Sequence, residues 1–573
     1  MNTLLLLIIC IAVLVAGYIL YGGWLCKQWG VGENKEETPA HTLEDGVDYV
    51  PAKAPVLMGH HFSSIAGAGP ITGPIGAAMF GWLPVTLWVL VGGIFFGGGH
   101  DFGALFASIR HKGQSIGEII SVNMSKRAKR LFIIFSYLTL ILVVAAFASI
   151  VASTFGATIK DGVVDKAASA ANASVAMVSL LFILIAIVFG FAVYRRNAPM
   201  LISSILGVVA IIICMAIGMN FHPIYLSTNT WMFIVGIYIA IASVTPVWIL
   251  LQPRDYLSSF LLYSMLIIAA FGVIGAHPDM DAFPAFAGFA VDNGNGVQYM
   301  FPILFTTVAC GAISGFHSLV SSGTTSKQLD KEKDAKPIAY GGMLLECVLA
   351  ILTLCAIAYA RKWNAANPDA QLAGATAIFA GGISKMVATI PGLAGTEKIL
   401  YTLLVLTYSA FCLTSLDTAT RLARFMFQEF WLEPGQTPKD IKSGYKKLMV
   451  NPYFATILTV VLGIALGMTG YSKIWGLFGA ANQLLAGLGL LAVATWLGNI
   501  GKNNKMFLIP MAFMMVVTIC SLCLTVKNQI GMIAKGGADW GPYAQTILGV
   551  LLIILAIILV IEGIQTLTKK KAA

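Results

Sequence analysis

The sequence predicts an all-α protein that crosses a lipid bilayer many times. Of its 573 residues, 58% are hydrophobic and 11% are charged, and such a composition cannot cover a water-exposed surface of ordinary polarity. Apolar stretches of roughly 20 residues, the length that a helix needs to cross the hydrocarbon core, recur along the chain. No polar gap between them is long enough for a soluble domain, so we expect a single integral membrane domain over residues 1–573.

Hydropathy predicts about fifteen membrane-spanning helices. We interpret the first as a retained span, because no basic leader precedes it as in a signal peptide. The predicted spans lie near residues 3–22, 62–82, 84–108, 130–154, 175–194, 198–218, 231–251, 257–275, 302–322, 337–361, 399–420, 453–470, 474–498, 506–526 and 545–566.

The placement of Lys and Arg supports this set of spans and orients it. Basic residues gather in alternate gaps, such as those containing Arg110 and Lys327 and the tail Lys569–Lys571, whereas residues 219–230 and 276–301 contain none. Basic loops are typical of the cytoplasmic side, so we expect a cytoplasmic C-terminus. The net charge of +10 then reflects membrane orientation, and no nucleic-acid partner is expected.

Two spans contain residues that interrupt a helix. Pro70 and Pro74 lie in the Gly-rich stretch Gly59–Gly76, and a second small-residue stretch covers residues 310–318 in a span of opposite direction. Backbone leaves helical geometry at membrane depth only beside protein or a cavity, and antiparallel interrupted helices are typical of inverted-repeat transporters. Close helix packing through small residues is the alternative. The candidate substrate-binding residues are Gly67, Ala68, Gly69, Thr72, Gly311, Ser314 and His317.

The order of elements resembles the LeuT-type, or amino acid/polyamine/organocation, architecture. After the second interruption come a span at 337–361, a short apolar segment at 377–391, a span at 399–420 and four more spans. Counting 377–391 as a span would invert every later loop, so we expect an external re-entrant hairpin there. Six spans rather than four separate the two interruptions, which predicts an inserted helix pair of unspecified identity.

Five motifs resemble the carbon starvation protein A (CstA) family. They are residues 59–76, 98–102, 243–257, 414–421 and 475–484, the last reading WGLFGAANQL. The resemblance implies a bacterial cytoplasmic-membrane importer that acts when preferred carbon is scarce. We expect secondary active import of short peptides, with pyruvate as the alternative substrate; the partners are then a small solute and the lipid bilayer. The chain has no GxxxxGK[ST] motif for ATP hydrolysis.

The LeuT-type resemblance also implies a coupling ion. In such transporters a sodium ion commonly lies between the first interrupted helix and hydroxyls of the helix corresponding to 399–420, and hard oxygen ligands suit this ion. Asp417 could bind a cation, carry a proton or pair with Arg421, because ionisable residues inside a span are costly. Each hydroxyl could instead bond its own helix. The candidate ion-coupling residues are Ala66, Gly67, Thr414, Ser415, Asp417 and Thr418.

Further polar residues have two interpretations each. Arg254 and Asp255 form either a gate or a structural ion pair, whereas Asn482 and Gln483 either contact substrate or join helices. Glu346 has no cation nearby in the sequence.

Four residues, His60, His61, His100 and Asp101, could form a transition-metal site, which would make the protein a membrane-embedded metal-dependent enzyme or sensor. Their spacing matches no ligand motif, so no resident transition metal is expected. A channel is the remaining alternative, and it is disfavoured because antiparallel interrupted helices suit rocking about a closed site.

Overall fold

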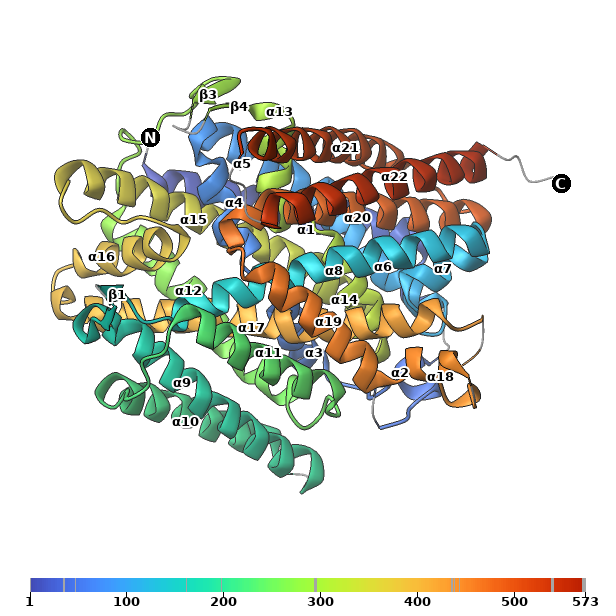
Figure 1. Ribbon diagram of the computed structural model, residues 1–573, viewed down its shortest axis with the longest axis horizontal. Helices are drawn as coiled ribbons and strands as arrows, with labels where there is room; N and C mark the ends of the chain where they lie inside the picture. The colour runs from blue at the N-terminus through green and yellow to red at the C-terminus, as the bar shows by residue number, and fades with distance from the viewer. Residues whose placement is uncertain are drawn as a thin grey trace.

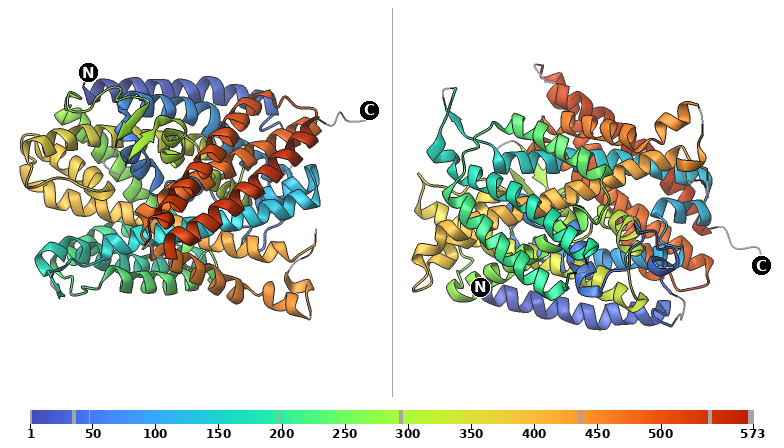
Figure 2. Two further views of the ribbon diagram at one scale, coloured as in Figure 1. Left: turned by 45° about the horizontal axis from the view of Figure 1, so that its top comes forward. Right: turned by 90° about the horizontal axis from the view of Figure 1, so that it is seen from below.

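A computed structural model describes residues 2–33, 37–46, 48–160, 162–196, 198–292, 296–433, 436, 438–442, 444–536 and 540–568. The tail Lys569–Lys571 lies outside the described residues. The long helices run roughly along one direction, with the N-terminus at one end of the bundle and the end of the last helix at the other (Figure 1). We call these ends the N-terminal face and the C-terminal face. Two further views show the same arrangement (Figure 2).

The first half of the chain is helical with one small β-hairpin. The hairpin pairs β1 (Ile159–Lys160) with β2 (Val163–Val164) in antiparallel register. The helices are α1 (Thr3–Trp29), α2 (Pro39–Thr42), α3 (Ala54–Ile65), α4 (Gly69–Ala77), α5 (Trp82–Val91), α6 (Gly98–Arg110), α7 (Ile116–Asn123), α8 (Lys126–Phe155), α9 (Lys166–Gly190), α10 (Met200–Asn220), α11 (Thr228–Val244) and α12 (Leu251–Ala276).

The second half begins with another antiparallel hairpin, β3 (Ala290–Asp292) with β4 (Val297–Tyr299), in which Ala290 lies opposite Tyr299. Its helices are α13 (Met300–Thr307), α14 (Gly315–Gly323), α15 (Gly341–Ala366), α16 (Gly382–Ala388), α17 (Glu397–Phe430), α18 (Tyr445–Met449), α19 (Pro452–Gly467), α20 (Tyr471–Asn499), α21 (Lys505–Ala534) and α22 (Trp540–Thr568).

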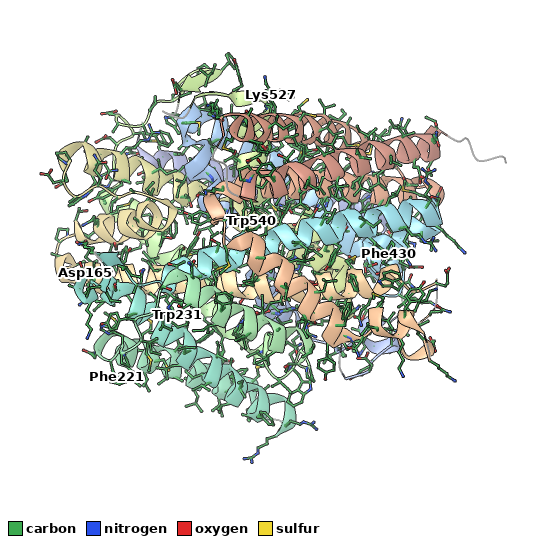
Figure 3. All side chains as sticks on the ribbon, viewed as in Figure 1. Asp165, Phe221, Trp231, Phe430, Lys527 and Trp540 are labelled. Atoms are coloured by element: carbon green, nitrogen blue, oxygen red, sulfur yellow. The ribbon has the colours of Figure 1, made fainter. Side chains whose placement is uncertain are left out.

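The predicted polytopic helix bundle is confirmed. Eleven helices among the described residues are long and apolar enough to cross a membrane, and each predicted span corresponds to one helix or to one interrupted helix. The outer helices expose large apolar side chains, such as Leu201, Ile457 and Ile509, around the bundle (Figure 3). Lipid is the solvent that such a surface needs.

Some boundaries differ from the prediction. The span predicted at 399–420 continues as α17 to Phe430, so that Arg421 and Arg424 lie in a helix instead of a loop. Their side chains are buried against neighbouring helices, and hydropathy ends a span at the first cluster of charges whether or not the charges are paired. The short helix α7 and both hairpins were not predicted.

Both predicted interruptions are present. α3 ends at Ile65, Ala66 leaves helical geometry with φ −73° and ψ 67°, and α4 starts anew at Gly69. Pro70 in the first turn of α4 has no N–H to lose from a helical bond. The second interruption separates α13 from α14, where Ser314 is extended with φ −140° and ψ 127°.

The packing of the helices shows an inverted repeat. The first repeat consists of α3/α4, the continuous α5–α6 span, α8, α11 and α12; the second consists of α13/α14, α15, α17, α19 and α20. α8 packs along its counterpart α17, and α11 along its counterpart α19. The contacts of α12 with α3 are matched by those of α20 with α13, and the contacts of α15 with α4 by those of α6 with α14. This is the LeuT-type arrangement.

The inserted pair is α9 and α10. These helices lie at the edge of the bundle and pack on each other and on α12 (Figure 1). The chain leaves and rejoins the core at one place, because the Ala157 N–H donates to the Leu226 carbonyl at 2.8 Å. The segment predicted as a re-entrant hairpin contains α16, which packs on α12, α15 and α17 at the N-terminal face.

Candidate functional site

The two interruptions lie directly against each other. A Cβ at Gly69 would lie 2.3 Å from Cys310 Cβ, and a Cβ at Gly73 would lie 2.7 Å from the Thr307 carbonyl oxygen and 2.9 Å from Val308 Cα. Glycine is needed at such a close approach because it has no Cβ. We call the contact between residues 66–73 and 307–315 the junction.

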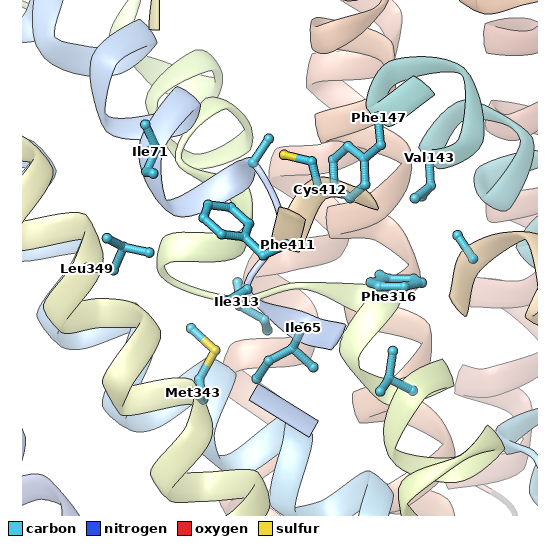
Figure 4. Close-up of a cluster of buried hydrophobic side chains, with 14 of the residues drawn as sticks. Ile65, Ile71, Val143, Phe147, Ile313, Phe316, Met343, Leu349, Phe411 and Cys412 are labelled. Carbon is cyan, nitrogen blue, oxygen red and sulfur yellow. The ribbon is translucent and has the colours of Figure 1, made fainter. Parts of the chain in front are cut away.

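Apolar side chains surround the junction. Ile65 and Ile313 lie beside the interrupted segments, with Phe316, Phe411 and Phe147 around them (Figure 4). All five side chains are at most 3% exposed. A polar group at the junction is therefore shielded from water, which strengthens its electrostatic interactions.

Asn482 of α20 caps the second interrupted helix. Its Oδ1 accepts a hydrogen bond from the Phe316 N–H at 2.8 Å, and its Nδ2 donates to Ser314 Oγ at 3.0 Å. A helix N-terminus leaves N–H groups that need such acceptors. The neighbouring Gln483 donates through Nε2 to the Phe305 carbonyl at 3.3 Å. The structure thus shows both amides joining α20 to α13 and α14.

The hydroxyls of α17 lie beside the first interruption. Ser415 Oγ donates to the Ser64 carbonyl at 2.9 Å, and a Cβ at Gly67 would lie 3.2 Å from the same Oγ. The hydroxyls of Ser64, Thr414 and Thr418 are buried and make no hydrogen bond among the described residues. We call Ser64, Thr414, Ser415 and Thr418 the hydroxyl cluster.

Thr72 contacts α17 separately from the hydroxyl cluster. Its Oγ1 lies 3.1 Å from the hydroxyl oxygen of Tyr408. This contact ties α4 to α17.

Arg254 is the centre of a buried ion-pair network. Its Nη1 donates to Asp417 Oδ2, its Nη2 donates to Asp255 Oδ1 at 3.2 Å, and Tyr238 donates to the same Asp417 oxygen at 2.9 Å. His60 Nδ1 lies 2.9 Å from Asp255 Oδ2. The network joins α3, α11, α12 and α17.

The pairing of Asp417 with Arg421, one of the interpretations from sequence, is wrong. Arg421 instead donates to the carbonyls of Ala242 and Thr245, at the C-terminal end of α11, where free carbonyls favour a cation. Asp417 faces α12 rather than along its own helix. Arg254 and Asp255 are 1% and 0% exposed in the first turns of α12, and the ion pair that crosses between helices joins Arg254 to Asp417. A gating role for Arg254 and Asp255 stays a prediction.

The four predicted metal ligands do not form one site. His60 bonds Asp255, His61 Nδ1 lies 2.8 Å from Thr325 Oγ1, and His100 Nδ1 lies 2.7 Å from Asp101 Oδ1. Adjacent residues on a helix point in different directions, which separates His60 from His61. The other carboxylate oxygen of Asp101, Oδ2, accepts from His317 Nδ1 at 2.8 Å.

Sequence reasoning missed Tyr238 and the partner of Glu346. Glu346 Oε2 lies 3.4 Å from His317 Nε2, although 29 positions separate them in the chain. A contact between residues so far apart cannot be predicted from a local sequence pattern. An acidic residue within an apolar span, however, indicates that Glu346 has a partner elsewhere in the chain.

A cavity of about 1070 Å³ opens at the C-terminal face. It is lined by mixed charges, including Glu118, Lys129 and Arg424, and reaches Ser322 and Gly323 at the end of α14. Tyr49 also lines it, and burial raises the pKa of this phenol, with Asp48 and Asp45 adding to the effect. The phenol, neutral near pH 7 at its ordinary pKa, therefore stays neutral over a wider range of pH.

Antiparallel interrupted helices that meet at a buried junction, within an inverted repeat, define a secondary membrane transporter. The chain belongs to the family described as carbon starvation protein CstA, whose match covers residues 2–371 and 366–521. The family resemblance seen in the sequence motifs is thereby confirmed.

Several named relatives share most of their length with this chain. "Peptide transporter CstA" of Bacillus subtilis (strain 168) is 30% identical and covers 99% of this chain and 97% of its own. "Peptide transporter CstA" of Escherichia coli (strain K12) is 31% identical over 90% of this chain and 80% of its own. "Pyruvate/proton symporter BtsT" of the same strain is 29% identical over 91% of this chain and 81% of its own.

Solved structures show more distant similarity. MhsT in complex with L-phenylalanine has a TM-score of 0.49 at 14% identity and covers 90% of this chain and 99% of its own. A mutant of the Eremococcus coleocola manganese transporter has a TM-score of 0.49 at 12% identity and covers 91% of this chain and 98% of its own.

Proposed function

We propose that the protein imports short peptides by alternating access, driven by an ion gradient. The observation that carries the proposal is the junction, where two interrupted helices from opposite repeats meet in a buried setting. Interrupted helices supply free N–H and C=O groups for a polar solute, and rocking of one repeat against the other would expose them in turn. Relatives named peptide transporters favour peptides as the solute.

The solute would bind along the junction at Gly67, Ala68, Gly69, Gly311 and Ser314. N–H groups at the start of α4 and α14 suit a carboxylate, which every unblocked peptide carries. Thr72, His317, Asn482 and Gln483 would shape the site, although the structure engages their side chains with protein partners.

Pyruvate is the second candidate substrate. It shares the carboxylate with peptides, and the relative named a pyruvate/proton symporter spans most of this chain. The two solutes differ in size and in the presence of an amino group, so direct competition distinguishes them.

The hydroxyl cluster is our candidate sodium site. Ser415 and the carbonyl of Ser64 supply one contact across the first interruption, and the free hydroxyls of Thr414 and Thr418 supply further oxygens. The carbonyls of Ala66 and Gly67 lie in the adjacent interrupted segment. Coupling to protons is the alternative, with Asp417 as the carrier; its pairing with Arg254 favours a structural role instead.

We also propose that the protein lies in the bacterial cytoplasmic membrane with the C-terminal face inside. α8 begins and α20 ends at that face (Figure 1). Lys126 is the first residue of α8, Lys502 follows α20, and Arg110 lines a cavity together with Lys502, in keeping with the usual excess of basic residues in cytoplasmic loops. The cavity of about 1070 Å³ at this face would then be the release path.

Uptake into proteoliposomes tests the proposal. Purified protein is reconstituted, and labelled dipeptide, tripeptide or pyruvate is offered under an inward sodium gradient, an inward proton gradient or neither. We expect saturable accumulation of peptide under one gradient, with unlabelled peptide competing better than pyruvate. Preferential pyruvate accumulation supports the second candidate. If neither solute accumulates under either gradient, the proposed function is wrong.

A further inference from the structure

Three side chains of metal-ligand type converge beside the junction. They are Cys310 at the second interruption, His317 on α14 and Glu346 on α15, and one ligand atom of each lies within 4.8 Å of the others. His317 and Glu346 are 0% exposed and Cys310 is 3% exposed. We call these residues the metal triad. None of the sequence motifs predicted them as a group.

The nitrogen and oxygen ligand atoms of the metal triad lack hydrogen bonds, whereas Cys310 Sγ lies 3.4 Å from Ser314 Oγ. His317 Nε2 and both carboxylate oxygens of Glu346 make none among the described residues, although leaving a buried polar group unpaired is costly. Nε2 and Oε2 are 3.4 Å apart without bonding each other, so they flank a shared position. Tetrahedral zinc with bonds of roughly 2.0–2.1 Å holds its nitrogen and oxygen ligands about 3.4 Å apart.

The contacts of His317 match those of metal-bound histidines, in which the ring nitrogen remote from the metal bonds a protein acceptor. His317 Nδ1 lies 2.8 Å from Asp101 Oδ2; a carboxylate accepts, so Nδ1 carries the proton and Nε2, 3.4 Å from Glu346 Oε2, keeps its lone pair. A carboxylate on the far nitrogen is typical of metal-bound imidazole. Asn482 Nδ2 lies 3.7 Å from Cys310 Sγ and donates to the sulfur, which stabilises a thiolate.

We propose that Cys310 Sγ, His317 Nε2 and the Glu346 carboxylate bind a divalent transition metal of the zinc class. Thiolate and imidazole ligands favour such an ion over sodium or magnesium. A thiolate and a carboxylate balance its two positive charges, which lowers the cost of burying them. Binding releases the thiol proton and any proton on Glu346.

The bound ion would fix the second interruption against α15. Cys310 precedes Ser314, where the chain is extended, and Glu346 lies on a neighbouring span. The metal triad is separate from the hydroxyl cluster, so its occupant is distinct from a coupling sodium ion. This inference does not depend on which solute is transported.

Cobalt substitution tests the metal triad. The full-length protein is purified, stripped with a chelator and titrated with Co²⁺, while absorbance reports tetrahedral cobalt in the visible range and thiolate-to-cobalt charge transfer in the near ultraviolet. We expect one Co²⁺ per chain, displaced by Zn²⁺. Cys310→Ser should remove the charge-transfer band, and His317→Gln and Glu346→Gln should weaken binding by at least roughly tenfold.

A matched control separates this site from the other thiols. Cys355 is also buried on α15 but lies outside the metal triad, so Cys355→Ser should keep the full spectrum. Size-exclusion profiles of every variant show whether it is folded, and Glu346→Asp, which retains a carboxylate, should restore part of the binding.

Absence of bound cobalt in the folded wild-type protein, or a charge-transfer band that survives Cys310→Ser, overturns the inference. The former result would leave His317 and Glu346 as a pair that shares a proton. Uptake by proteoliposomes is a separate readout, so failure of the metal site and failure of the proposed transport are distinguishable.

Discussion

At the scale of single residues, the buried network around Arg254 has the clearest energetic consequence. One guanidinium neutralises carboxylates on its own helix and on α17, at sites that are almost fully buried. Removing one member of such a pair leaves an uncompensated charge in a medium of low dielectric constant.

Arg254→Met should therefore destabilise the protein by about 3–5 kcal/mol. Melting in detergent, followed by size-exclusion chromatography, measures the loss, and Arg254→Met combined with Asp417→Leu should recover much of it. The exposed pair of Lys362 and Asp279 provides the control, because Lys362→Met should shift melting little. Equal shifts in melting temperature for Arg254→Met and Lys362→Met would contradict a stabilising role of the network.

The hydroxyl cluster leads to a second residue-scale prediction. Thr414→Ala and Ser415→Ala should each raise the sodium concentration for half-maximal uptake by at least roughly tenfold, since each removes one oxygen ligand. Thr420→Ala is the matched control on the same helix, because its hydroxyl donates to the Leu416 carbonyl at 2.8 Å. If uptake by the wild-type protein does not depend on sodium, the hydroxyl cluster is not the coupling site.

At the scale of helices, sequence and structure agree where the signal is local. Pro70 and the surrounding glycines act on their own backbone, so the interruption near residues 66–68 was predictable. The partner of Asp417 was not predictable, because Arg254 is 163 positions away and only the packed bundle brings them together. Hydropathy could not identify the inserted pair, since α9 and α10 are as apolar as the spans of the core.

The identification of α9 and α10 as an insertion can be tested by deletion. Replacing residues 158–225 with two glycines should give a folded, monodisperse protein that still transports, because Ala157 and Leu226 already bond at 2.8 Å. Lipid can cover the exposed faces of α12 and α17, although some stability will be lost with the packing. Size-exclusion chromatography and uptake measure both effects. A deletion protein that aggregates entirely would show that the pair belongs to the core.

At the scale of the whole molecule, charge determines how the bundle sits in the membrane. α15 ends at the N-terminal face and α20 ends at the C-terminal face (Figure 1). Lys362 lies near the end of α15, and Lys502 lies between α20 and α21. In intact cells, a membrane-impermeant maleimide should label Lys362→Cys, and should label Lys502→Cys only after permeabilisation. Wild-type protein is the control for native thiols. The reverse pattern would invert the proposed orientation.

The central claim is that solute passes through the junction, and Gly73 offers the most direct measurement. An alanine Cβ there would lie 2.7 Å from the Thr307 carbonyl oxygen and 2.9 Å from Val308 Cα, whereas a Cβ at Gly476 meets nothing within 4 Å. Peptide uptake by proteoliposomes is compared for the two alanine variants. We predict that Gly73→Ala loses at least roughly tenfold of the wild-type rate, equivalent to about 1.4 kcal/mol, while Gly476→Ala retains it. Wild-type uptake by a folded Gly73→Ala protein would contradict the claim.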